Sequence, residues 1–187
     1  MLAMIRFPLL KHIRVSDYQL YPGPAGSGGI DRALPSGVTV IAGVNGLGKT
    51  TLLNMIFRVL SGPCDWRVVG EDDIGNIKHE LVRWRHPSYF RDRVRNGAAG
   101  AVVTAEVGFG VTTINVSRSL EDFSVQSLLI DGSALEPSEE RYQSSVRAAS
   151  GVDSDAQGIF IINSLVRLAA RKVSKRSSAS TACTMAL

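Results

Sequence analysis

The chain has 187 residues, of which 44% are hydrophobic and 20% are charged, and its formal net charge is +4. These values suit a globular protein with one core, and the small positive charge permits an acidic partner such as nucleic acid without requiring one. No run of 18 apolar residues is present, so the sequence predicts no membrane span. Two separated cysteines, Cys64 and Cys183, exclude a zinc cluster or disulfide framework and favour a cytoplasmic location.

The first part of the chain predicts extended structure followed by a strand, a loop and a helix. Residues 4–21 are expected to be extended, and a loop rich in glycine and proline follows at 21–29. Residues 38–42 form a short run rich in β-branched side chains, which is typical of a buried strand. Residues 51–60 have apolar side chains at helical spacing, and Gly62-Pro63 ends this predicted helix.

Between the predicted strand and helix, residues 43–50 fit the phosphate-loop pattern G-x-x-x-x-G-K-[ST]. Glycines allow such a backbone to curl and to aim its N–H groups at an anion, and the helix adds its positive end. Lys49 is predicted to reach the β- and γ-phosphates, and the Thr50 hydroxyl to ligate Mg²⁺. The predicted nucleotide-binding residues are Gly43, Asn45, Gly46, Leu47, Gly48, Lys49, Thr50 and Thr51.

Residues 61–99 are polar and predict irregular structure, with a basic part in which aromatic residues stand among arginines. Trp84, Tyr89 and Phe90 could stack on nucleic-acid bases while the arginines contact phosphates. The alternative is a solvated surface whose aromatic side chains anchor it to the core, and this alternative is favoured because such charge runs are common on surfaces.

The rest of the chain predicts antiparallel strands, then helices. Apolar and polar residues alternate from 101 to 130, which indicates two or three strands, and Asp131-Gly132 is a hairpin turn signal. Residues 139–149 and 159–170 are expected to be helical, whereas the basic, serine-rich end from 171 is expected to be loose. The predicted division is a lobe over 1–165 and a tail over 166–187.

These features together resemble the N-terminal lobe of ABC-type ATPase heads, in particular the SMC/RecF-like group of chromosome-maintenance and DNA-repair ATPases of the AAA family. The resemblance is carried by the early strands, the sequence Gly-x-Asn-Gly-x-Gly-Lys-Thr-Thr and the later strands that include 116–120. Asn45 is typical of that group. The nearest candidate for the glutamine that senses the γ-phosphate is Gln157. Its distance along the sequence from the phosphate loop is about twice the spacing typical of ABC transporters.

The resemblance implies an α/β P-loop NTPase lobe, with a mixed sheet and an antiparallel β-meander, that binds ATP and Mg²⁺. Gln157 would join Thr50 at the metal, and Arg6, Arg14 and Arg118 are candidates for contacts to the phosphates or the base. In that family ATP lies between two heads. The implied partners are therefore a C-terminal lobe or second head, in a homo- or heterodimer, and DNA, in repair, chromosome maintenance or DNA-directed defence.

The catalytic elements of that family are not found in this sequence. Leu60-Ser61-Gly62-Pro63 is too close to the phosphate loop to be the signature Leu-Ser-Gly-Gly, and no histidine stands at a late position. No catalytic residue is assigned, so the chain alone is expected to bind nucleotide with negligible turnover. A truncation or a reading-frame change near 165 is expected to account for these missing elements.

Two other functions remain open on the sequence. Ser127-Leu128-Leu129-Ile130-Asp131 could be a strand that ends in a metal-binding aspartate, which would suit a self-contained P-loop kinase or NTPase. Gly132 stands where a catalytic glutamate would follow, and a turn explains Asp131-Gly132 better. The other possibility is a regulator or fragment that binds nucleotide without hydrolysing it.

Overall fold

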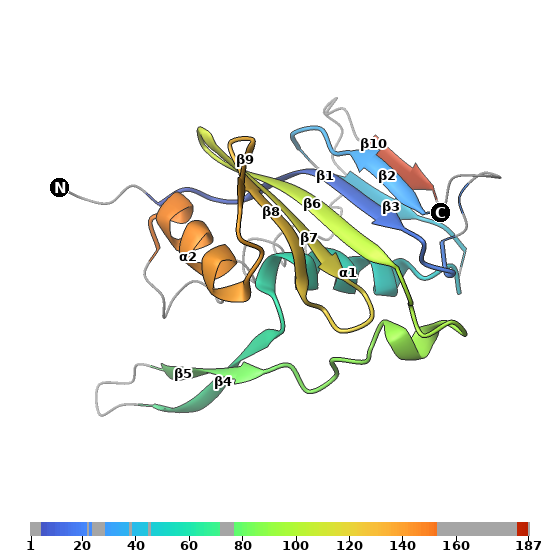
Figure 1. Ribbon diagram of the computed structural model, residues 1–187, viewed down its shortest axis with the longest axis horizontal. Coiled ribbons are helices and arrows are strands. Elements are labelled where there is room, and N and C mark those ends of the chain that lie inside the picture. The colour runs from blue at the N-terminus through green and yellow to red at the C-terminus, as the bar shows by residue number, and fades with distance from the viewer. Residues whose placement is uncertain are drawn as a thin grey trace, which may run out of the picture.

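The computed structural model describes residues 5–21, 23, 29–37, 39–44, 46–71, 77–152 and 183–186. Within them the chain is a mixed α/β protein built on a six-stranded antiparallel sheet, in the order β2-β1-β6-β7-β8-β9 (Figure 1). Its strands are β1 (Leu9–Ser16), β2 (Ile30–Ala33), β6 (Val102–Phe109), β7 (Thr112–Ser119), β8 (Val125–Ile130) and β9 (Ser133–Leu135). The predicted antiparallel strands are confirmed, and Asp131-Gly132 forms the turn between β8 and β9.

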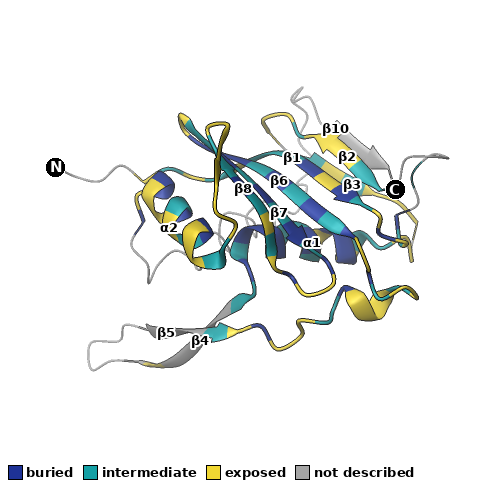
Figure 2. Cartoon of the chain, viewed as in Figure 1, coloured by how far each residue is buried: buried dark blue, intermediate teal, exposed yellow. Residues whose placement is uncertain are grey.

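The core lies between the sheet and helix α1 (Lys49–Ser61). Side chains alternate along β6 and β7 between buried and half-buried positions, as expected for a sheet with one covered face. Leu52, Met55 and Val59 of α1 are fully buried, and their spacing of three and four places them on one helix face. Buried residues accordingly gather where the strands cross α1 (Figure 2).

Helix α2 (Glu139–Ser150) packs against β7 and β8, beside the C-terminal end of α1 (Figure 1). The predicted helices over 51–60 and 139–149 are therefore confirmed, each with an extra residue or two at its ends. Ser138 caps α2, since its side chain accepts a hydrogen bond from the Arg141 N–H. Among the described residues, no helix is both long enough and apolar enough to cross a bilayer.

Two smaller sheets complete the described structure. Strand β3 (Thr39–Ala42) pairs in parallel with β10 (Cys183–Ala186), and β4 (Cys64–Glu71) pairs antiparallel with β5 (Ile77–Arg83). The expectation of irregular structure over 61–99 is thus wrong for β4 and β5, which reach out from the body as a hairpin (Figure 1). Residues 183–186 of the tail that was expected to be loose form β10, and the rest of that tail lies outside the described residues.

The extended structure near the N-terminus is shorter than predicted. Extended structure over 4–21 is confirmed only as far as Ser16, because Asp17 takes a positive φ of 56° and the Tyr21 N–H donates to the Tyr18 carbonyl at 3.0 Å. Residues 17–21 are therefore a turn, called here the tyrosine turn. The helix expected over 159–170 lies outside the described residues.

Candidate functional site

The phosphate loop connects the end of β3 to the start of α1, as the sequence predicts (Figure 1). Gly46 and Gly48 have positive φ angles of 92° and 77°, which glycine adopts without steric cost. Gly48 is the N-cap residue of α1 and, having no side chain, it provides no capping hydrogen bond. The first turn of α1 contains no acidic residue, so the helix itself places no negative charge beside its N–H groups and positive dipole end. Asn45 lies outside the described residues.

The Lys49 side chain folds back over this loop. Its Nζ donates to the carbonyl oxygens of Gly43 and Val44, each at 2.7 Å. These two bonds hold the ammonium group inside the curve of the loop, where its charge adds to that of the helix end. The sequence assigned Lys49 to the phosphates, and the structure brings it together with Gly43, Gly46 and Gly48 in one loop.

The remaining predicted loop residues differ in their exposure. Thr50 and Leu47 are exposed, so the Thr50 hydroxyl is open to a ligand at the first turn of α1. Thr51 is only 2% exposed and belongs to the buried side of the helix. Among the described residues, no group of three His, Cys, Asp or Glu side chains could hold a metal ion. The prediction that Thr50 ligates Mg²⁺ stays a prediction.

The tyrosine turn lies directly under the phosphate loop. The Tyr21 hydroxyl donates to the Gly48 carbonyl at 2.8 Å, and the same oxygen accepts the Leu52 N–H at 2.9 Å. A Cβ atom added at Gly48 would lie 2.8 Å from Leu20 Cδ2 and 3.1 Å from Tyr21 Cε1. Burial raises the pKa of Tyr21 well above its ordinary value, so its hydroxyl keeps its proton. Sequence analysis missed Tyr21, because no local pattern links it to a residue 27 positions away.

At the other end of α1, the fully buried Arg118 is the centre of a cluster that we call the arginine clamp: Arg118, Phe123, Glu139 and Tyr142. The guanidinium donates to the Val59 carbonyl at 3.1 Å, and its two terminal nitrogens lie 2.5 and 3.2 Å from the Glu139 carboxylate oxygens. It also lies over the Phe123 and Tyr142 rings. The expectation that Arg118 contacts a nucleotide is therefore wrong, because its guanidinium is fully buried and paired with Glu139.

The other candidates also lie away from the loop. Arg6 has its side chain beside Gly110 in the turn from β6 to β7, and Arg14 is exposed on β1, 3.9 Å from an Asp31 oxygen. Asp131 lies in the β8–β9 turn, where its Oδ1 accepts the N–H of Thr113 of β7 at 2.7 Å. Figure 1 shows this turn at the end of the sheet away from the start of α1. This placement fits the turn interpretation. Gln157 lies outside the described residues.

The basic segment after β5 turns its aromatic side chains inward. Trp84 and Phe90 are buried in the core, the half-buried Tyr89 accepts a hydrogen bond from Asn54 of α1, and Trp84 packs at 5.9 Å from Phe90. The favoured interpretation, with aromatic anchors and a solvated surface, is thus confirmed for these rings. Five arginines remain exposed on this segment: Arg83, Arg85, Arg91, Arg93 and Arg95.

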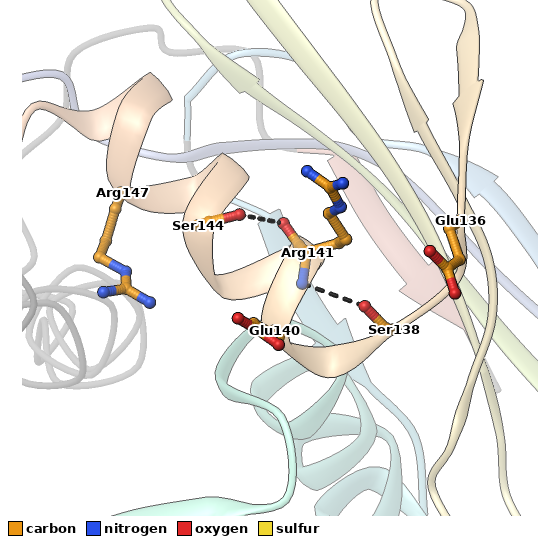
Figure 3. Close-up of a pocket in the computed structure, with 6 residues that line it drawn as sticks. All are labelled: Glu136, Ser138, Glu140, Arg141, Ser144 and Arg147. Atoms are coloured by element: carbon orange, nitrogen blue, oxygen red, sulfur yellow. Dashed lines mark hydrogen bonds between the residues drawn. The ribbon is translucent and has the colours of Figure 1, made fainter.

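A surface hollow of about 810 Å³ lies along α2 (Figure 3). Glu136, Glu140, Arg141 and Arg147 line it, with Ser138 and Ser144. Figure 3 shows the two arginines and the two glutamates spread along its wall rather than converging on one point. Its charges balance and it contains no phosphate-loop residue, so it is not the candidate site.

No known protein family matches the chain, and no curated protein resembles it in sequence. Among solved structures, the fold overlaps with the SMC head in a crystal structure of that head bound to the C-terminal winged-helix domain of ScpA. The TM-score is 0.45 and the sequence identity is 16%, over 75% of this chain and 40% of that one. The chain thus spans less than half the length of the SMC head, and a likeness this weak says nothing of what the chain binds.

Proposed function

We propose that this chain binds the triphosphate of ATP together with Mg²⁺ at its phosphate loop. The observation that carries the proposal is the Lys49 ammonium held at 2.7 Å from two loop carbonyls, at the uncapped start of α1. A positive side chain and free helix N–H groups at one point suit an anion. Lys49 then moves from the carbonyls to the β- and γ-phosphates, and Thr50 meets the metal. Asn45 and Gln157 keep their sequence-based assignments to the nucleotide and the metal.

The same proposal limits what the chain does alone. Hydrolysis requires a group that orients the attacking water and charges that stabilise the transition state. The Arg118 guanidinium is bonded inside the arginine clamp, and the Asp131 carboxylate accepts a hydrogen bond in its own turn. Neither group therefore contributes to the phosphate loop. We therefore propose an SMC/RecF-like ATPase lobe that binds without turnover until a C-terminal lobe and a second head complete the site.

The binding of a fluorescent ATP analogue with Mg²⁺ tests the proposal. Lys49→Ala is expected to weaken binding about 10- to 100-fold, the range for losing hydrogen bonds to a charged group. Arg85→Ala, which removes an exposed positive charge outside the loop, is the matched control and should bind like the wild type. Equal binding by wild type and Lys49→Ala would overturn the proposal, and phosphoryl transfer to a small acceptor by this chain alone would favour a self-contained kinase.

The proposed role in DNA repair, chromosome maintenance or DNA-directed defence requires contact with DNA. The five exposed arginines of the 83–95 segment support it, since Asp92 is the one acidic residue among them. Replacing Arg91, Arg93 and Arg95 with alanine should weaken binding to duplex DNA. The slope of log affinity against log salt concentration should also become shallower, by the amount expected for losing about three phosphate contacts. Unchanged binding and salt dependence would overturn the proposed DNA contact and leave the proposed nucleotide binding standing.

A further inference from the structure

The Gly48 carbonyl has two hydrogen-bond donors, one from within α1 and one from outside it. Leu52 N–H donates at 2.9 Å as the first regular bond of the helix, and the Tyr21 hydroxyl donates at 2.8 Å from the tyrosine turn. A carbonyl oxygen has two lone pairs, so both are occupied. The second bond comes from a residue 27 positions earlier in the chain.

This carbonyl shares its peptide plane with the N–H of Lys49. In a trans peptide the C=O and N–H groups point in opposite directions, so fixing one fixes the other. We propose that Tyr21 is a positioning residue of the nucleotide site, which holds the Gly48–Lys49 peptide so that the Lys49 N–H faces the bound phosphate. This inference rests on the proposed function and concerns the phosphate groups of the ligand rather than its base.

The tyrosine turn is built to keep that hydroxyl in place. Tyr21 is 5% exposed and Tyr18 is 2% exposed, and their ring centroids are 5.7 Å apart. The Tyr18 hydroxyl donates to the Phe90 carbonyl at 2.8 Å, and Gln19 Oε1 accepts the Arg95 N–H at 3.1 Å. Both sides of the turn are therefore tied to the 90–96 segment, and the Leu20 side chain fills the space beneath Gly48. The hydroxyl cannot swing away without disturbing the core.

A purely structural role for Tyr21 predicts something different, and the molecule contains a matched control. The Tyr142 hydroxyl donates to the Leu60 carbonyl at 2.6 Å, so it bonds the backbone of the same helix at its opposite end. Tyr142 is 2% exposed, and burial raises its pKa above the ordinary value, as it does for Tyr21. Replacing either tyrosine with phenylalanine removes one buried hydroxyl and keeps the ring.

The experiment measures equilibrium unfolding and binding of the ATP analogue for Tyr21→Phe and Tyr142→Phe. Both variants are expected to lose similar stability, but only Tyr21→Phe should bind ATP more weakly, by about three- to tenfold, the range for one hydrogen bond. The same fold-change is expected with inorganic tripolyphosphate, because the positioned N–H faces phosphate. A merely structural tyrosine would not separate the two variants in this way.

Lys49→Ala distinguishes failure of this inference from failure of the proposed function. If binding depends on Lys49 but Tyr21→Phe binds like the wild type, the positioning role is overturned and the nucleotide site stands. Equal weakening in Tyr21→Phe and Tyr142→Phe would also overturn it, since a general loss of stability would then explain both. If the wild type shows no binding that depends on Lys49, the proposed function fails first.

Discussion

The two ends of α1 differ in what their backbone groups meet. At the C-terminal end, the carbonyls of Val59 and Leu60 accept hydrogen bonds from Arg118 and Tyr142, both buried. At the N-terminal end, no side chain caps the helix, and the Lys49 ammonium is held by carbonyls of its own loop. Buried polar groups are normally satisfied, whereas a free helix N-terminus is a ready site for an anion. One end thus secures the helix to its neighbours, and the other is the end at which we propose that a ligand binds.

Breaking the arginine clamp should have the largest effect on stability. Arg118→Ala removes the buried donor to Val59 and Phe123 and the positive partner of Glu139, which keeps the hydrogen bond from Gln143. Because the Glu139 side chain is 33% exposed, we expect a loss of about 3 kcal/mol, at the low end for a broken buried pair. Urea denaturation measures this, with the exposed Arg141→Ala in α2 as a control within about 0.5 kcal/mol.

The clamp prediction sharpens the comparison if nucleotide binding is measured as well. Under conditions in which Arg118→Ala is still folded, its affinity for ATP should equal that of the wild type, because the clamp lies at the far end of α1. A loss below about 1 kcal/mol would show that the cluster is not a main source of stability. A large loss of affinity in the folded variant would show that the two ends are coupled.

At the open end, Gly48→Ala should cost about 2 kcal/mol and abolish most nucleotide binding. The new Cβ meets Leu20 at 2.8 Å, and the backbone has a φ of 77° that alanine avoids. Gly46→Ala is the matched control, since its φ is 92° but no atom lies within 4 Å of the added Cβ. It should lose only about 1 kcal/mol. Equal losses in the two variants would contradict the close packing of the tyrosine turn under the loop.

Ser138→Ala should destabilise the clamp end by a smaller amount. Its side chain accepts the Arg141 N–H at 3.2 Å and begins α2, the helix that supplies Glu139 and Tyr142. Loss of such a cap costs about 1 kcal/mol. Ser144→Ala, in the exposed middle of the same helix, should be neutral or slightly stabilising, since alanine is the better helix former. Thermal denaturation of both variants checks this, and equal melting temperatures would contradict it.

The phosphate loop could be predicted from sequence because the residues that form it are consecutive. Strand, glycines and Lys49 lie within one short run, so pattern and propensity are sufficient. The tyrosine turn could not, because its bond to Gly48 joins residues 27 positions apart. The same holds for the strands β4 and β5, whose polar sequences gain their order from pairing with each other.

The arginine clamp is an instructive intermediate case. Ile114 and Val116 of β7 and Leu120 directly after it are buried at every second position, and the same period places Arg118 on that face. The pattern therefore did contain a signal that Arg118 points into the core. What it lacked was the identity of the partners, since Val59 and Glu139 come from two helices distant in sequence. A charged residue at a buried strand position indicates a structural pair before it indicates a ligand contact.

The smallest expected effect concerns pH at the loop that carries Phe123, whose carbonyl accepts from Arg118. The Ser124 backbone N–H, followed by its hydroxyl, holds the pKa of Asp122 below the ordinary value of 3.8. A lowered pKa stabilises the folded chain at neutral pH, and this contribution disappears as the pH falls through the folded pKa. Because Asp122 is exposed, Asp122→Asn should lose less than about 1 kcal/mol at pH 7. In thermal melts the difference in stability between Asp122→Asn and wild type should vanish toward acid pH. Ser124→Ala should make the contribution of Asp122 smaller without abolishing it, because the backbone N–H of residue 124 still donates to the carboxylate. A difference that stays constant with pH would assign the effect to packing instead of charge.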